Sequence, residues 1–87
     1  MDALEASPTE AANMRARSEL MIAVKQAVAG WAVTQAAAAR RLEVTQPRLN
    51  DLIRGRINNF SLDALILLAT RAGLRVHVEI EPAEVPA

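Results

Sequence analysis

The side chains best suited to molecular recognition lie together in one short stretch of the sequence. Gln46, Arg48 and Asn50 carry groups that can make paired hydrogen bonds. Arginine can fork onto the edge of guanine, and glutamine or asparagine onto the edge of adenine. Leu49 and Leu52 take the positions of a buried helix face, so the polar side chains fall outside that face. We predict contacts to base edges of double-stranded DNA for Gln46, Arg48 and Asn50. The alternative is that these polar side chains are simply solvated, and the string of residues by itself does not outweigh it.

A second group of residues is suited to contact phosphates. Arg54 and Arg56 flank Gly55, where a chain that leaves a DNA groove passes the sugar–phosphate backbone. Helices that start at Gln35 and Gln46 would present free backbone N–H groups, which favour anions. The predicted contacts to the DNA backbone are Thr34, Gln35, Thr45, Arg54 and Arg56.

Charge is distributed unevenly, although the whole chain has a formal net charge of zero. Residues 1–13 contain three acidic residues, residues 14–57 contain eight basic and three acidic residues, and the remainder contains two basic and four acidic residues. The middle block, residues 14–57, therefore carries a net charge of +5. Such a block can meet a polyanion, but it can equally be a solvated helical surface, and charge alone does not separate these interpretations.

The inventory of reactive side chains argues against an enzyme. The sequence has no cysteine, a single histidine, His77, and no glycine-rich phosphate loop. His77 lies on a charged face beside Arg75 and Glu79, which indicates a solvated residue rather than a catalyst or ligand. We therefore predict no catalytic residue, no metal ligand and no cofactor.

Size and composition predict one small, mostly α domain. The 87 residues suffice for a single domain, and 18 alanines beside only two aromatic residues favour helices packed through small side chains. No apolar run is long enough to cross a bilayer, and the acidic residues 1–13 do not resemble a signal peptide. We expect a cytoplasmic protein that does not contact a membrane. It has an acidic segment over residues 1–13, in which a helix starts, and one domain over residues 14–87.

Start and stop signals place four helices in this domain. The predicted helices begin after Ser7, Thr34, Thr45 and Ser61, and they end near Gly30, Leu42, Arg54 and Gly73. Serine and threonine are preferred at helix starts, and glycine is preferred just past helix ends. Only residues 43–45 separate the second and third helices, so these two helices must cross steeply, as in a helix-turn-helix.

The sequence changes period after the fourth helix. Apolar residues alternate with charged residues from Leu74 to Glu81, which predicts a strand with one buried face. A lone strand leaves its backbone groups without partners. We therefore predict a homodimer in which the strand over residues 74–81 pairs with its own copy, with Val76, Val78 and Ile80 at the contact. The alternative is a frayed tail packed on the fourth helix.

Taken in order, these motifs resemble the XRE class of repressor-type helix-turn-helix domains. The resemblance covers roughly residues 19–81. Its motifs are Thr34-Gln35, the alanines of the second helix, Val44-Thr45-Gln46-Pro47-Arg48-Leu49, Asp51-Leu52-Ile53-Arg54-Gly55, Phe60-Ser61-Leu62-Asp63 and Gly73-Leu74-Arg75-Val76. The sequence is most similar to the small subgroup of HigA-type antitoxins. The resemblance implies a domain of five or four helices, an operator DNA and a dimer.

The resemblance also implies roles for single residues. Gln35 would contact phosphate and brace Gln46, while Arg48 and Asn50 would face bases. The sequence departs from the family at Glu43, which stands where the family commonly has glycine. A left-handed conformation at Glu43 would cost about 1 kcal/mol.

Two functions are consistent with these observations. The first is a sequence-specific DNA-binding transcriptional regulator, an autoregulating repressor of the antitoxin type. The second is a protein-interaction antitoxin that mainly neutralises a RelE-like toxin ribonuclease, with DNA binding secondary. A neighbouring reading frame that encodes such a basic ribonuclease would favour the second function.

Overall fold

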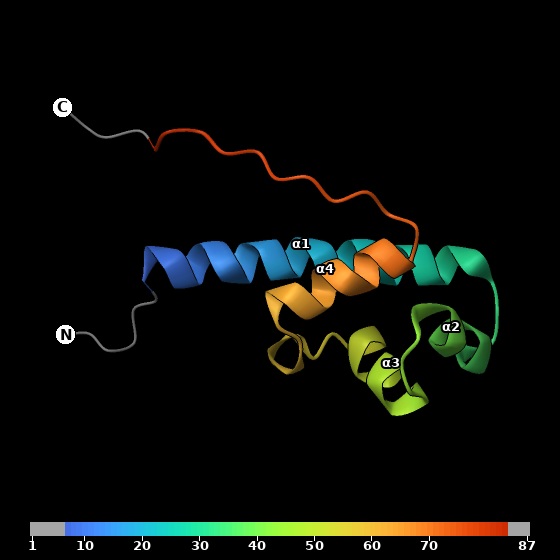
Figure 1. Ribbon diagram of the computed structural model, residues 1–87. Coiled ribbons are helices and arrows are strands. Elements are labelled where there is room, and N and C mark those ends of the chain that lie inside the picture. The colour runs from blue at the N-terminus through green and yellow to red at the C-terminus, as the bar shows by residue number, and fades with distance from the viewer. Residues whose placement is uncertain (1–6, 84–87) are drawn as a thin grey trace.

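The computed structural model describes residues 7–83, which form four α-helices and one short 3-10 helix. These are α1 (Pro8–Trp31), α2 (Gln35–Leu42), α3 (Gln46–Ile53), η1 (Ile57–Asn59) and α4 (Leu62–Arg71). Figure 1 shows α1 as a long rod with α4 alongside, and α2 and α3 grouped near its C-terminal end. The predicted mostly α class is confirmed, with four α-helices in the described residues. Residues 1–6 of the predicted acidic segment lie outside the described residues. Ser7 caps α1, and residues 8–13 belong to this helix.

The first helix starts where predicted and ends later than predicted. At its start, the Ser7 hydroxyl accepts a hydrogen bond from the Glu10 N–H at 3.0 Å, and the Glu10 carboxylate accepts one from the Ser7 N–H at 3.1 Å. The prediction that Gly30 ends the helix is wrong, because Gly30 is helical and the left-handed residue is Ala32, with a φ of 54°. The longer helix carries Trp31 against the core, and this packing offsets the modest cost of a helical glycine.

The three shorter helices share one form of N-cap. In each, a hydroxyl oxygen accepts a hydrogen bond from the backbone N–H three residues further on, which satisfies one of the free amides of the helix start. The pairs are Thr34 with Ala37 at 3.1 Å, Thr45 with Arg48 at 3.2 Å and Ser61 with Ala64 at 3.1 Å. The predicted starts of α2, α3 and α4 are therefore confirmed.

The turn between α2 and α3 holds Glu43 in the left-handed region, at a φ of 60°. The Glu43 N–H donates to the Arg40 carbonyl at 3.1 Å. The Val44 N–H donates to the Ala39 carbonyl at 2.9 Å. These two bonds close a helix end in the pattern that usually places glycine at the position of Glu43. The steep helix-to-helix turn predicted from the sequence is thus formed without glycine.

Arg71 of α4 supports this turn from the other side. Its Nη1 donates to the Leu42 carbonyl at 3.2 Å, and its Nη2 lies 3.7 Å from the Glu43 carboxylate. A carbonyl at the C-terminal end of a helix has no N–H partner within the helix. A guanidinium N–H can therefore supply the missing hydrogen bond. These contacts tie the turn to α4 and help to hold Glu43 in a conformation that costs about 1 kcal/mol.

The core consists of aliphatic side chains and one aromatic ring. α1 packs along α4, and α2 packs against α3. Ala38 and Ala39 of α2 are buried, as expected for an alanine run that another helix approaches closely. Phe60, which is 1% exposed, is the largest fully buried side chain. The other buried hydrophobic residues are Met21, Val24, Leu42, Leu49, Leu52, Leu65, Leu68, Ala69 and Ala72.

The chain after α4 runs back over α1 as an extended segment (Figure 1). Leu74 and Val76 are half-buried and pack against the core, whereas Arg75 and His77 are exposed, as the alternation predicts. Residues 7–83 contain no paired strand, so the strand predicted over residues 74–81 is not formed within the single chain. A strand needs a partner for its backbone groups, and a second copy of the chain could supply one. Pairing across a dimer therefore stays a prediction.

We predict that Gly30→Ala stabilises the protein by about 0.5–1 kcal/mol, because alanine is the better residue inside a helix. No atom lies within 4 Å of a Cβ added at Gly30, so the methyl group meets open space. Urea denaturation of both chains measures the difference. Gly73→Ala is the matched control: its Cβ also meets open space, but its φ is +86°, so a loss of about 1 kcal/mol is expected. A destabilised Gly30→Ala chain would mean that α1 ends at Gly30.

Candidate nucleic-acid interface

α3 presents a row of polar side chains on the side away from the core. Gln46 and Arg54 are exposed and Asn50 is half-buried, while Leu49 and Leu52 are buried beneath them. Residues four apart lie above one another on a helix, so Gln46, Asn50 and Arg54 share one side; we call them the α3 row. The α3 row brings together two of the predicted base contacts and one of the predicted backbone contacts.

Arg48, the remaining predicted base contact, does not lie in the α3 row. Its Nη1 donates to the Asn59 carbonyl at 2.7 Å, and its guanidinium lies over the Phe60 ring, 4.0 Å from the centroid. Arg48 therefore links α3 to η1 and to the start of α4. To reach a base, its guanidinium must leave both partners. Motif reasoning missed these contacts because Asn59 lies 11 residues further along the chain.

Thr34, Gln35 and Thr45 lie at two helix starts, as predicted. The hydroxyls of Thr34 and Thr45 serve as N-caps, and all three residues are exposed. The first backbone amides of a helix have no acceptor within it, and the helix dipole favours an anion at that end. The start of α2 offers the amides of Gln35 and Ala36 to a phosphate group. At the start of α3, Pro47 has no N–H and Thr45 binds the Arg48 N–H, so this start offers the amide of Gln46.

Arg54 and Arg56 are exposed on either side of Gly55. The Nε of Arg56 lies 3.8 Å from the Asp51 carboxylate, which also accepts a hydrogen bond from the Asn59 side chain at 3.4 Å. The Arg56 side chain is 52% exposed, so this ion pair is weak and leaves the guanidinium accessible to phosphate. The Asp51 carboxylate, to which the sequence assigned no role, reduces the positive potential beside Arg56.

Only part of the positive block over residues 14–57 is free to meet an anion. Arg17 of α1 turns inward, and its Nη1 donates to the carbonyls of Ile57 and Phe60 at 3.2 and 3.3 Å. The guanidinium of Arg41 lies over the Trp31 ring, 4.0 Å from the centroid, and remains exposed. A count of charges along the sequence therefore overstates the positive surface near α3.

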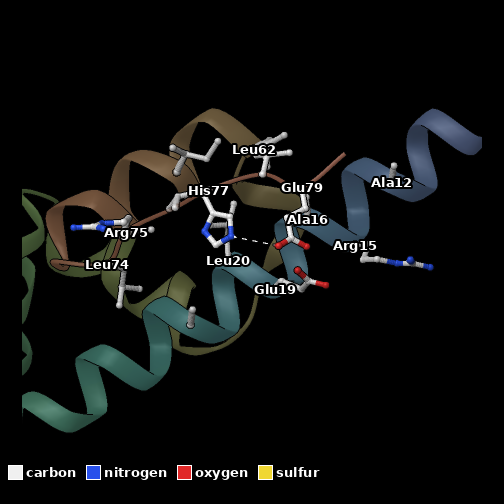
Figure 2. A pocket seen from close by; sticks show the side chains of 15 residues that line it. Ala12, Arg15, Ala16, Glu19, Leu20, Leu62, Leu74, Arg75, His77 and Glu79 are labelled. Atoms are coloured by element: carbon white, nitrogen blue, oxygen red, sulfur yellow. Dashed lines mark ion pairs between the residues drawn. The ribbon is translucent and has the colours of Figure 1, made fainter. Parts of the chain in front are cut away.

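A separate apolar groove lies between α1, α4 and the extended segment, with a volume of about 800 Å³ (Figure 2). We call it the α1–α4 groove. Its apolar wall consists of Ala12, Ala16, Leu20, Leu62 and Ile66. None of its lining residues belongs to α2 or α3, so it is distinct from the α3 row. At its edge, the exposed His77 has its Nε2 3.8 Å from the Glu79 carboxylate, which agrees with a solvated residue.

No group of three His, Asp or Glu side chains in residues 7–83 could hold a metal ion. No helix in this range has the length and apolar character needed to cross a membrane.

Comparison with known proteins gives a family match and a structural match. The profile of the family described as a helix-turn-helix domain matches residues 4–81. A solved structure of a protein named as a candidate XRE-family transcriptional regulator matches with a TM-score of 0.76 and 24% sequence identity, over 86% of this chain and 88% of that chain. At this identity the likeness shows a shared fold. No curated protein matches the sequence.

We predict that Arg48→Ala lowers the free energy of unfolding by about 1–2 kcal/mol, because it removes a hydrogen bond and a cation–π contact. Chemical denaturation measures this loss. Gln46→Ala is the control, since Gln46 is exposed on the same helix and its loss should stay within about 0.5 kcal/mol. Unchanged stability of the Arg48→Ala chain would contradict the role of Arg48 as a link between α3 and α4.

Proposed function

The chain belongs to the helix-turn-helix domain family, and on this premise we propose that it is a sequence-specific DNA-binding transcriptional regulator of the XRE class. The observation that carries the proposal is the α3 row, exposed on a short helix that a tight turn joins to α2. In helix-turn-helix proteins, the second helix of the unit lies in the major groove and its N-terminal residues contact base edges. α3 has this role in our proposal.

The chemistry of the α3 row supports base recognition at one end and phosphate contact at the other. Gln46 and Asn50 each carry an amide that can make two hydrogen bonds to the edge of adenine. Gln46 is the first residue of α3, the end that reaches deepest into the groove in this family of motifs. Arg54 follows the last turn of α3, where the helix rises toward the DNA backbone.

Arg48 contributes to base recognition by a change of partner. In the free protein it binds the Asn59 carbonyl and the Phe60 ring. A forked pair with guanine provides about 1–3 kcal/mol of discrimination against other bases, which is of the same order as the two contacts that Arg48 would give up. We therefore keep Arg48 as a predicted base contact that forms on binding.

Phosphate contacts from both ends of the unit would hold α3 in register. Thr34, Gln35 and Thr45 are exposed at the two helix starts, and Arg54 and Arg56 are exposed after α3. Contacts of this kind position a protein on the duplex without reading its sequence. Acting on an operator upstream of its own gene, such a domain would be an autoregulating repressor.

A dimer through the C-terminal segment would supply the second half-site. A single recognition helix reads only a few base pairs, so repressors of this kind place two helices about 34 Å apart on a near-palindrome. Val78 and Ile80 are 74% and 90% exposed, which supports a second copy as their cover. The backbone groups of an unpaired extended segment favour the same arrangement.

The antitoxin role can coexist with DNA binding in one chain. It requires a partner, which the resemblance to HigA-type antitoxins suggests is a RelE-like ribonuclease. Co-expression with the product of the neighbouring reading frame tests this role. A stable complex in which the ribonuclease is inactive supports it, and an uninhibited ribonuclease contradicts it.

We predict that binding to DNA from its own promoter weakens steeply with salt, because phosphate contacts release counterions. Arg56→Ala should lower the affinity for specific and random DNA alike and reduce the salt slope by about 1. Fluorescence anisotropy between about 50 and 200 mM salt measures both effects. The control is Arg56→Lys, which keeps the charge and hence the slope. Affinity that does not vary with salt, or no binding at low salt, would contradict the proposed function.

We predict a different pattern for base contacts. Gln46→Ala, Arg48→Ala and Asn50→Ala should each cost about 1–3 kcal/mol on the preferred site and much less on random DNA. Competition with single-base operator variants should show relaxed preference at one position for each. Arg54→Ala is the control, since loss of a phosphate contact affects both DNAs equally. Equal losses on both DNAs for Arg48→Ala would reassign Arg48 from a base contact to a contact with the DNA backbone.

We predict that replacing both Val78 and Glu79 by proline gives a monomer at micromolar concentration. Successive N–H groups of a strand point to opposite edges, so one of the two prolines removes a ladder donor whichever edge is paired. Both residues are exposed, so the helical circular dichroism should remain. Sedimentation measures the mass, and Val78→Thr with Glu79→Gln is the control that keeps both amides. A dimer of the proline chain would show that the interface lies elsewhere.

A further inference from the structure

The C-terminal segment carries its charges in a definite order. On one face, Arg75 and His77 come first and Glu79 and Glu81 follow, and all four are exposed. The other face is apolar from Leu74 to Ile80. A strand that is basic at its start and acidic at its end is complementary to an antiparallel copy of itself. This complementarity identifies a second copy as the partner of the segment.

We propose that two copies of residues 74–81 pair antiparallel with the two-fold axis at Val78, a register that rests on the strand dimer proposed above. Facing residues are then equally far from Val78 along the two strands. The facing pairs are Val78 with Val78, His77 with Glu79, Val76 with Ile80 and Arg75 with Glu81. Arg75 and Glu81 carry opposite charges, and opposite charges that face each other stabilise a sheet. His77 faces the Glu79 carboxylate as a hydrogen-bond donor and adds a charge only when it is protonated.

The neighbouring registers are less favourable for the same electrostatic reason. An axis at His77 faces Arg75 with Glu79 but brings the two copies of His77 together. An axis at Glu79 brings two carboxylates face to face, and an axis at Val76 faces Arg75 with His77. Like charges directly opposite each other destabilise a strand pair. Among these registers, the axis at Val78 alone faces Arg75 with an acidic residue and also faces His77 with an acidic residue.

The same register provides a cover for the exposed apolar side chains. Facing residues project from the same side of a two-stranded ribbon, and Val76 packs against the core of its own domain. Ile80 of one copy therefore lies beside Val76 of the other copy, above the other α1–α4 groove. Figure 2 shows the segment passing over this groove, whose alanine-rich α1 wall leaves a volume of about 800 Å³ for a neighbouring side chain.

Charge reversals at Arg75 and Glu81 test the register. In a homodimer of the Arg75→Glu variant, two acidic residues face each other at both 75–81 pairs. In a homodimer of the Glu81→Arg variant, two basic residues face each other at the same pairs. Each variant should raise the dissociation constant of the dimer about tenfold at low salt, and less at high salt because exposed charges are screened. Mixed in equal amounts, the two variants should form a heterodimer as tight as the wild-type dimer, because each reversed residue then faces its opposite. Sedimentation gives the constants, and native mass spectrometry identifies the heterodimer.

Glu79→Arg is the matched control, because an axis at His77 would pair Arg75 with Glu79. In the proposed register, Arg75→Glu mixed with Glu79→Arg dimerises no more tightly than Arg75→Glu mixed with wild type. Tight pairing in this control mixture would overturn the axis at Val78 in favour of His77. Unchanged constants for both single variants, or a wild-type chain that stays monomeric, would overturn the proposed register.

These measurements are made without DNA, so their outcome is independent of the proposed function. A failed rescue together with salt-dependent DNA binding rejects the register and leaves the regulator in place. A successful rescue in a chain that does not bind DNA supports the register and rejects the regulator.

Discussion

The arrangement of the helices depends on the packing around the buried side chain of Phe60. Phe60 is the largest fully buried side chain in a core that is otherwise aliphatic, and it lies in the connection between α3 and α4. Arg17 of α1 binds two carbonyls of this connection, and Arg48 of α3 covers the ring and binds the Asn59 carbonyl. Three helices therefore meet at one connection. Together with the packing of α3 against α2, these contacts hold α3 and the α3 row in place.

Arginines serve both structure and recognition in this small domain. A guanidinium offers five donors, so a single side chain can satisfy carbonyls that helix ends and connections leave free. Arg17 and Arg71 are used in this way, whereas Arg54 stays exposed. Arg48 stands between these uses, because its present contacts stabilise the fold and its chemistry suits guanine. In the proposed complex, Arg48 must therefore give up internal contacts before it can bind guanine. The side chains of the α3 row have no such contacts to give up.

The C-terminal segment obeys a different constraint from the helices. Helices satisfy their backbone groups internally, but an extended segment needs a second strand. Leu74 and Val76 anchor the segment to the core, and the apolar residues beyond them are exposed. One domain thus determines where the segment starts and which face it turns inward, while its pairing depends on a partner.

The sequence by itself determined the features that arise within a few residues. The N-caps at Thr34, Thr45 and Ser61 were predicted correctly because a capping hydroxyl bonds only three residues away. The burial of Leu49 and Leu52 on one face of α3 and the inward positions of Leu74 and Val76 followed from periodicity in the same way. Tertiary structure alone decided that α1 continues past Gly30, because the packing of Trp31 against the core outweighs a local stop signal.

Tertiary structure also decided which charges remain free. Arg17 binds a carbonyl 40 residues away, and Arg48 binds one 11 residues away, so neither contact leaves a pattern in a sequence window. The sequence specifies what each guanidinium can bind, and the packing of distant segments decides what it does bind, because hydrogen bonds form only between groups that the fold brings within reach.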